Sequence, residues 1–246
     1  RLEQGYNAHS YDACKRGLVD AIQDVDADVI VLNEYCTEKS FEKELKDLGY
    51  SYVHCAAVDF PTALATRLKV KEQNEIIMSE DRSALLAQVH TKDDDELVWV
   101  IGTHVNYFSG EQRMKEMQVL LKELEDMHII GGNMKARVVL VADLNQQREN
   151  DYTPDEWERI RSGMLYRRSS QDDGVAKMLA DRGFVCAWDS TPPPDTNWET
   201  SHAPATHWSG TIVDYSYGCN VSPLAVSIGC AGWSDHRMTV CDWSLL

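Results

Sequence analysis

Two stretches of this chain are continuously apolar and end in acids or amides, and this pattern constrains the fold most. Residues 28–34 read DVIVLNE, and residues 137–145 read RVVLVADLN. A short apolar run without polar alternation predicts a strand that is buried on both faces. Sheets of α/β type place their ligands at the carboxyl ends of such strands. We therefore expect an α/β protein in which Glu34, Asp143 and Asn145 lie at strand ends.

Hydrophobic spacing and capping residues predict the other elements around these two strands. Helices are expected over residues 11–25, 41–48, a stretch capped by Ser109, a stretch from Pro154 capped by Thr153, and a stretch from Asp172 or Asp173 to Leu179. Further strands are expected over residues 50–56, 75–79, 84–91, 97–103, 211–217, 224–228 and 238–243. Residues 57–74 and 190–209 show no clear period, which predicts loops.

Length and composition favour one domain over residues 1–246, because no linker-like shift in composition divides the elements. No apolar run approaches the roughly 18 residues of a membrane span. The net charge of −16 opposes non-specific capture of nucleic acid, although a local basic patch and metal ions still permit such a substrate. The seven cysteines include no Cys-x-x-Cys pair, which argues against a zinc site. The chain begins at Arg1, so a removed leader stays open, as does the compartment.

Three further segments carry polar groups at or near strand ends. His104 follows the strand over 97–103, Asp214 lies within the strand over 211–217, and Asp235 and His236 precede the last strand. Each alone is ordinarily a solvated strand terminus or a structural residue. Their recurrence is harder to explain in that way, because clustered carboxylates repel one another and persist when a cation or a proton holds them together. Oxygen ligands without thiolates favour Mg²⁺, Mn²⁺ or Ca²⁺ over zinc.

Five short motifs in these segments resemble those of the endonuclease/exonuclease/phosphatase superfamily, which has the deoxyribonuclease-I-like fold. The family patterns L-Q-E, T-H-L, G-D-F-N, I-D-Y and S-D-H are matched, in this order, by residues 32–34, 103–105, 142–145, 212–215 and 234–236. Arg113, Gln118 and the segment 74–79 add supporting detail. The resemblance implies a four-layer α/β/β/α sandwich of two packed mixed sheets. It also implies a divalent-metal-dependent phosphoric ester hydrolase.

The resemblance assigns catalytic roles to five residues. Asp143 corresponds to the residue that orients or deprotonates the attacking water, and Asn145 to one that holds the phosphate. His236 corresponds to the imidazole that binds or protonates a phosphoryl oxygen, and Asp214 would orient a catalytic histidine. His104 would be a second phosphate-contacting or acid/base group. Attack on a phosphodiester requires these functions together with charge neutralisation on the non-bridging oxygens.

The same resemblance implies a site for Mg²⁺ or Mn²⁺. Glu34 corresponds to the main metal ligand, and Asp235 to a neighbouring acid that helps to hold the metal. The family also has an asparagine metal partner at the end of its first strand. Two registers place that position either at Asn7 or at Arg1, so this ligand is left open. Asn33 replaces the family's usual glutamine before the glutamate.

Three classes of function remain open from the sequence. The first is a nuclease that hydrolyses phosphodiesters in DNA or RNA. The second is a phosphatase or a phospholipase-C-type enzyme that acts on inositol phosphate or sphingomyelin-like substrates, for which the net charge matters less. Trp198, Trp208 and Trp233 would stack bases, line a headgroup pocket or pack against the sandwich edge. The third class is a binding module on a decayed active site, against which the five motifs count.

Overall fold

The computed structural model describes residues 11–35, 39–92, 94–132, 136–162, 174–190, 205–207, 211–229 and 234–245. Its largest sheet has six strands in the order β4-β5-β6-β7-β9-β8. These strands are β4 (Val70–Ile77), β5 (Ser83–His90), β6 (Leu97–His104), β7 (Arg137–Asp143), β8 (Val185–Cys186) and β9 (Asp214–Cys219). The sheet is mixed, because β6 and β7 pair in parallel whereas the other neighbours pair in antiparallel fashion.

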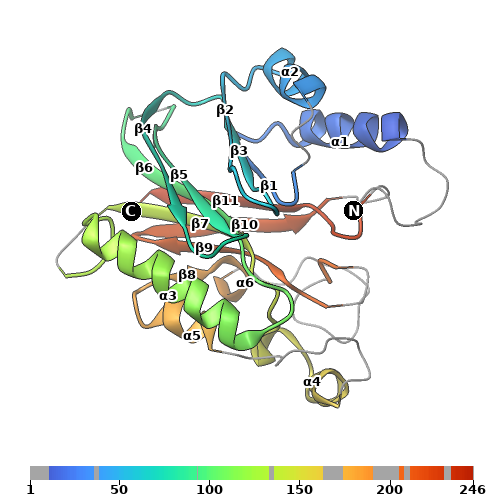
Figure 1. The fold of residues 1–246 in the computed structure, drawn as a ribbon, viewed down its shortest axis with the longest axis vertical. Coiled ribbons are helices and arrows are strands. Elements are labelled where there is room, and N and C mark those ends of the chain that lie inside the picture. The colour runs from blue at the N-terminus through green and yellow to red at the C-terminus, as the bar shows by residue number, and fades with distance from the viewer. Residues whose placement is uncertain are drawn as a thin grey trace.

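Two smaller sheets form a second layer against the six-stranded sheet (Figure 1). One has the order β1-β3-β2, and the other pairs β10 with β11. Their bounds are β1 (Val29–Leu32), β2 (Tyr52–Cys55), β3 (Ala63–Thr66), β10 (Val221–Ile228) and β11 (Thr239–Leu245). A cluster of apolar side chains packs the layers together, with Leu64 of β3 and Val221 of β10 against Leu85, Val100 and Val139. Burial of this apolar area from water stabilises the sandwich.

Helices cover the outer faces of both layers (Figure 1). α1 (Tyr11–Val25) and α2 (Lys39–Asp47) pack on the β1-β3-β2 sheet, where Ile22 and Leu45 are buried with Ala65. α3 (Gly110–Asp126) and α5 (Val175–Ala180) cover the six-stranded sheet. The remaining helices are η1 (Glu149–Asp151), α4 (Pro154–Arg161) and α6 (Ala187–Ser190). The expected α/β/β/α sandwich is confirmed.

Several details of the expected elements differ from the structure. Every strand pair described in the second layer is antiparallel, so only the six-stranded layer is mixed in the described residues. The loop predicted over residues 57–74 is wrong, because these residues contain β3 and most of β4. β3 is four buried residues, too short to show a period, and the exposed polar residues 71–74 of β4 mask the alternation. Asp214 lies at the start of β9 rather than in the middle of a strand.

The predicted helix starts agree with the structure where it describes them. Ser109 caps α3 by accepting a hydrogen bond from the Gln112 backbone N–H. Thr153 and Glu156 form a reciprocal capping box at the start of α4. α5 begins after Gly174, and the predicted caps Asp172 and Asp173 lie outside the described residues. Within the described parts of the chain, no helix is both long and apolar enough to cross a membrane.

Gly102 of β6 allows the two sheet layers to approach closely beside β1. A Cβ atom added there would lie 2.8 Å from Val31 Cγ1 and 3.4 Å from Thr62 Cγ2. We expect Gly102→Ala to lower the free energy of unfolding by about 1–3 kcal/mol, because overpacking forces neighbouring side chains to shift. Urea denaturation measures this change. The exposed substitution Ala180→Val should stay within about 0.5 kcal/mol, and an equally small effect at Gly102 would contradict the packing argument.

Candidate active site

Strand pairing aligns three polar residues in a row at one edge of the six-stranded sheet. His104 ends β6 and is the register partner of Asp143, which ends β7. Asp143 is in turn the partner of Asp214, which begins β9. Register partners on neighbouring strands have adjacent side chains. The parallel β6–β7 pair and the antiparallel β9 therefore bring residues far apart in the sequence into one continuous row.

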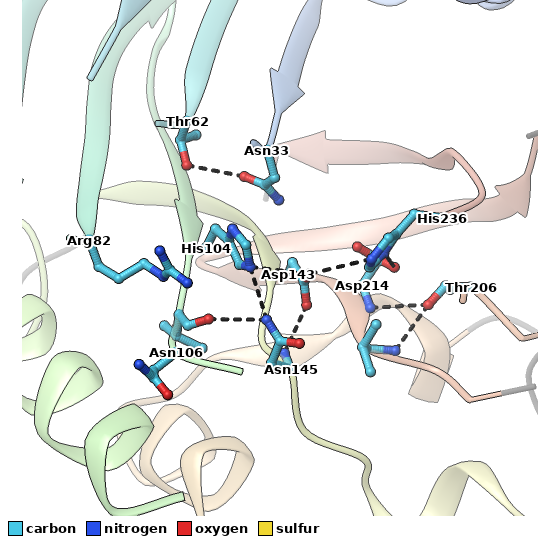
Figure 2. Close-up of polar contacts among 12 residues, drawn as sticks. Asn33, Thr62, Arg82, His104, Asn106, Asp143, Asn145, Thr206, Asp214 and His236 are labelled. Atoms are coloured by element: carbon cyan, nitrogen blue, oxygen red, sulfur yellow. Dashed lines mark hydrogen bonds and ion pairs between the residues drawn. The ribbon is translucent and has the colours of Figure 1, made fainter. Parts of the chain in front are cut away.

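Asp143 lies between two imidazoles in the centre of this row (Figure 2). Its Oδ2 atom is 3.5 Å from His104 Nε2 and 3.8 Å from His236 Nε2. Its Oδ1 atom accepts a 2.8 Å hydrogen bond from the Asn145 backbone N–H. The side chain is 5% exposed, so this carboxylate is held in one orientation with little solvent around it. Such a fixed carboxylate is suited to orient or deprotonate a water molecule.

Asn145 turns back toward β6 through a left-handed backbone conformation. Its φ of 48° is one that asparagine adopts more readily than most residues. The side-chain Nδ2 atom donates to the Val105 carbonyl at 3.1 Å and lies 3.0 Å from His104 Nε2. Because an amide nitrogen only donates, this contact requires His104 Nε2 to accept.

His236 is charged at neutral pH because of the acids around it. Its Nδ1 atom lies 2.8 Å from Asp214 Oδ2. Burial alone would lower the pKa of His236, but the Asp214 carboxylate, with weaker contributions from Asp143 and Asp235, raises that pKa to about 10. Thr206 Oγ1 fixes the start of β9 by accepting the backbone N–H groups of residues 213 and 214. The site thus holds the His236 imidazolium between Asp214 and Asp143, with the His104 imidazole on the other side of Asp143.

A second group of side chains lies on the other side of His236. His207 and His236 form an isolated antiparallel β-bridge, and their ring centroids are 4.8 Å apart. In the described residues, His207, Asp235 and His236 form one set whose ligand atoms all lie within 4.8 Å of one another. Asp143, Asp214 and His236 form another such set. The structure therefore places the predicted metal ligand Asp235 beside two imidazoles.

The other predicted metal ligand, Glu34, lies on the opposite layer. It directly follows β1, is exposed, and has a φ of 52°, which costs a glutamate of order 1 kcal/mol. Asn33 beside it accepts a 3.1 Å hydrogen bond from Thr62 Oγ1, and Figure 2 shows this pair facing His104 across the site. Neither set of clustered ligand atoms in the described residues includes Glu34. Asn7 and Arg1, the two candidates for the asparagine partner, lie outside the described residues.

Helix α3 fixes the loop that follows His104. Glu116 is fully buried, and its carboxylate accepts hydrogen bonds from the Asn106 backbone N–H at 2.7 Å and from Ser79 Oγ at 2.9 Å. Arg113, noted in the sequence for its place after the T-H motif, is also buried and donates to the Asn106 carbonyl at 3.2 Å. These bonds hold the chain immediately beyond the end of β6 and so stabilise the position of His104.

Arg82 is a site residue that the sequence did not reveal. It precedes β5, is 1% exposed, and its guanidinium carbon lies 4.0 Å from the centre of the Phe60 ring. Nη1 donates to the Asp81 carbonyl, but Nε and Nη2 are buried with no hydrogen-bond partner among the described residues. Figure 2 shows the guanidinium pointing toward His104. A buried cation with unmatched donors at a strand end is suited to bind an anion.

Comparison with known proteins supports the fold expected from the motifs. No protein-family model and no curated protein sequence matches the chain. Among solved structures, the human Nocturnin catalytic domain with bound sulfate is 17% identical, with a TM-score of 0.70 over 98% of this chain and 90% of that chain. D. rerio TDP2 complexed with single-strand DNA product is 15% identical, with a TM-score of 0.67 over 94% and 91%.

A Bacteroides vulgatus endonuclease/exonuclease/phosphatase is 13% identical, with a TM-score of 0.66 over 96% of this chain and 92% of that chain. The chain therefore has the deoxyribonuclease-I-like fold of endonuclease/exonuclease/phosphatase proteins. Identities this low establish the fold, and the chemistry has to be argued from the site.

The charge on His236 leads to a prediction about its titration. In protein free of divalent cations, we expect Asp214→Asn to lower the pKa of His236 from about 10, because the partner that most stabilises the imidazolium is neutralised. Titration of the His236 ring signals by NMR measures this shift. The folded pKa exceeds the usual 6.5, so the histidine contributes stability below about pH 6.5 that is lost as pH rises through 10. An unchanged titration in the variant would contradict this assignment.

The unmatched donors of Arg82 lead to a second prediction. Arg82→Met keeps an unbranched apolar stem as far as the position of Nε but removes the guanidinium charge and its donors. We expect sulfate binding to weaken at least about tenfold, since hydrogen bonds to charged groups contribute about 1.5–3 kcal/mol. Calorimetric titration with sulfate measures the affinity. Arg159→Met, at an exposed position on α4, is the matched control and should bind sulfate like the wild type; equal affinity in the Arg82 variant would remove Arg82 from the site.

Proposed function

We propose that this protein is a divalent-metal-dependent phosphodiester hydrolase, and that its substrate is nucleic acid. The observation that carries the proposal is the position of Asp143 between His104 and His236, with Asn145 beside it. This arrangement offers a base, a hydrogen-bond donor and a cationic imidazole within one site. The TDP2 structure of similar fold was determined with a single-strand DNA product, which favours nucleic acid as the substrate class.

The side chains of the site have separate roles in phosphodiester hydrolysis. Asp143 orients the attacking water and accepts its proton as the water oxygen bonds to phosphorus. The P–O bond to the leaving oxygen breaks in the same displacement, and that oxygen takes a proton from solvent water. The His236 imidazolium donates a hydrogen bond to a non-bridging oxygen, whose negative charge grows as the water attacks. The Asn145 amide, whose two N–H groups face Val105 and His104, would turn one of them from His104 to the phosphate. Arg82 adds a second positive charge from the opposite side of His104. Electrostatic stabilisation of this kind by fixed groups is usually the largest contribution to catalysis.

The donor set also fits the divalent cation that the proposal requires. Glu34 and Asp235 would hold Mg²⁺ or Mn²⁺, with carboxylate oxygens of the type that these ions prefer. The cluster of Asp143, Asp214 and His236, whose ligand atoms lie within 4.8 Å of one another, supports this fit, because two carboxylates there face one imidazole. When bound, the cation would neutralise phosphoryl charge and acidify a water molecule.

A phosphatase or phospholipase-C-type activity is the second candidate. The net charge of −16 favours it, because an acidic protein repels a polyanion more strongly than it repels a single phosphate group. The same row of side chains would serve an inositol phosphate or a sphingomyelin-like headgroup. The two candidate functions therefore share a site and differ in the substrate that this site accepts.

The proposal is tested by assaying purified protein with Mg²⁺ or Mn²⁺. The substrates are plasmid, single-stranded DNA, RNA, sphingomyelin and inositol phosphates. We expect hydrolysis of a nucleic acid, and a decrease in kcat/KM of about 10²–10⁴-fold in Asp143→Asn, because the isosteric amide cannot accept the proton. Asp155→Asn, an exposed acid on α4, is the matched control and should leave the rate unchanged.

Other outcomes of this assay have distinct meanings. Turnover of a lipid or inositol phosphate alone would favour the second candidate over a nuclease. Wild-type rates in Asp143→Asn would disprove the role of the row. No metal-dependent activity on any of the substrates would exclude both enzymatic functions.

A further inference from the structure

The group formed by His207, Asp235 and His236 is not explained by phosphodiester hydrolysis alone. We propose that these three side chains form a second cation site, which takes a transition-metal ion of the Zn²⁺ class and inhibits the enzyme when it is filled. The inhibition rests on the proposed function, whereas the cation site does not. The residues come from two chain segments that meet at the His207–His236 bridge.

Backbone bonds fix the two imidazoles side by side. The His207 N–H donates to the Thr211 carbonyl at 3.0 Å, and the Arg237 N–H donates to the Thr206 carbonyl at 2.7 Å. Residues opposite each other in an antiparallel bridge carry their side chains on the same face. The rings accordingly lie edge to face at 66°, and the three ligand atoms are within 4.8 Å of one another. Only small side-chain movements are needed to bring them around one ion.

The donor chemistry selects the class of ion. Two imidazole nitrogens and one carboxylate oxygen are a frequent set for Zn²⁺, with a water in the fourth position, whereas Mg²⁺ prefers oxygen ligands alone. His207 is 7% exposed and Asp235 is exposed, so protein covers the site at His207 and water reaches it at Asp235. The lack of Cys-x-x-Cys pairs argued against zinc, but histidines here replace the thiolates that such pairs supply.

The nitrogen of His236 that faces the ion is set by Asp214. Because Nδ1 lies 2.8 Å from the Asp214 carboxylate, Nε2 is the nitrogen left to bind a metal. A carboxylate behind a metal-bound histidine fixes the ring and increases its basicity. The same Nε2 lies 3.8 Å from Asp143 Oδ2, on the side where the substrate phosphate would bind. An ion on this nitrogen therefore displaces the proton that His236 would offer to the phosphate, and it also engages the Mg²⁺ ligand Asp235.

Zn²⁺ binding tests the site directly, without reference to activity. Calorimetric titration in buffer without Mg²⁺ is carried out on the wild type, on His207→Phe, which keeps an aromatic ring, and on His207→Gln, which keeps a polar group. We expect binding to weaken at least about tenfold in both variants, and the Zn²⁺ concentration for half-inhibition to rise by the same factor. His90→Ala is the matched control: His90 pairs with Asp95 at the opposite end of β5 and should leave both values unchanged.

Equal Zn²⁺ affinity in the wild type and in both His207 variants would overturn the cation site. Four cysteines in the described residues are free thiols that also attract Zn²⁺, but they are unchanged in every variant, so a difference between variants reports on His207. Zn²⁺ binding that depends on His207, in a protein without hydrolase activity, would support the cation site and overturn the proposed function. Binding at His207 that leaves hydrolysis unaffected would overturn the inhibition.

Discussion

The parallel pairing of β6 with β7 is the constraint on which the whole site depends. It brings the carboxyl ends of two buried strands to the same edge, where His104 and Asp143 become register partners. β9 then enters from that edge in the antiparallel direction and adds Asp214 to the row. A slip of one residue in any of these pairs would turn the side chains to the other face of the sheet. The apolar packing between the layers therefore also fixes the relative positions of these three side chains.

The electrostatics of the row follow from this geometry. Asp143 and Asp214 are brought together by the register, and such acids would repel each other without a positive charge between them. His236 supplies that charge, since its protonated form is stabilised by both carboxylates and its pKa rises to about 10. Glu34 and Asp235 lie further out and are exposed. The imidazolium offsets one of the two carboxylate charges of Asp143 and Asp214, and the exposed acids are the ones proposed to hold the divalent cation.

Much of this arrangement was predictable from the sequence, because the continuous apolar run of β7 reveals a buried strand and its end reveals Asp143. The prediction that β1 is buried on both faces is wrong, because β1 is an edge strand of its sheet and all four of its residues are half-buried. Residues 57–74 were not predictable, since β3 is very short and β4 has polar exposed residues on an edge strand. Arg82 escaped notice because a single arginine before an apolar strand ordinarily lies in solvent, and only the three-dimensional packing buries it. His207 lies in a segment without periodicity, and nothing in its neighbours indicates a bridge to His236.

Three species would compete for one nitrogen atom of His236. A proton, a phosphoryl oxygen and a transition-metal ion would all engage Nε2, because Asp214 occupies Nδ1. The carboxylates that stabilise the imidazolium also strengthen the attraction for a metal, so the features that make His236 a good cation for the phosphate make it a good ligand once the proton leaves. His207→Phe would preserve the aromatic contact with His236 and remove the proposed metal ligand. The proposed cation site would therefore give His207 a chemical role that packing alone does not require.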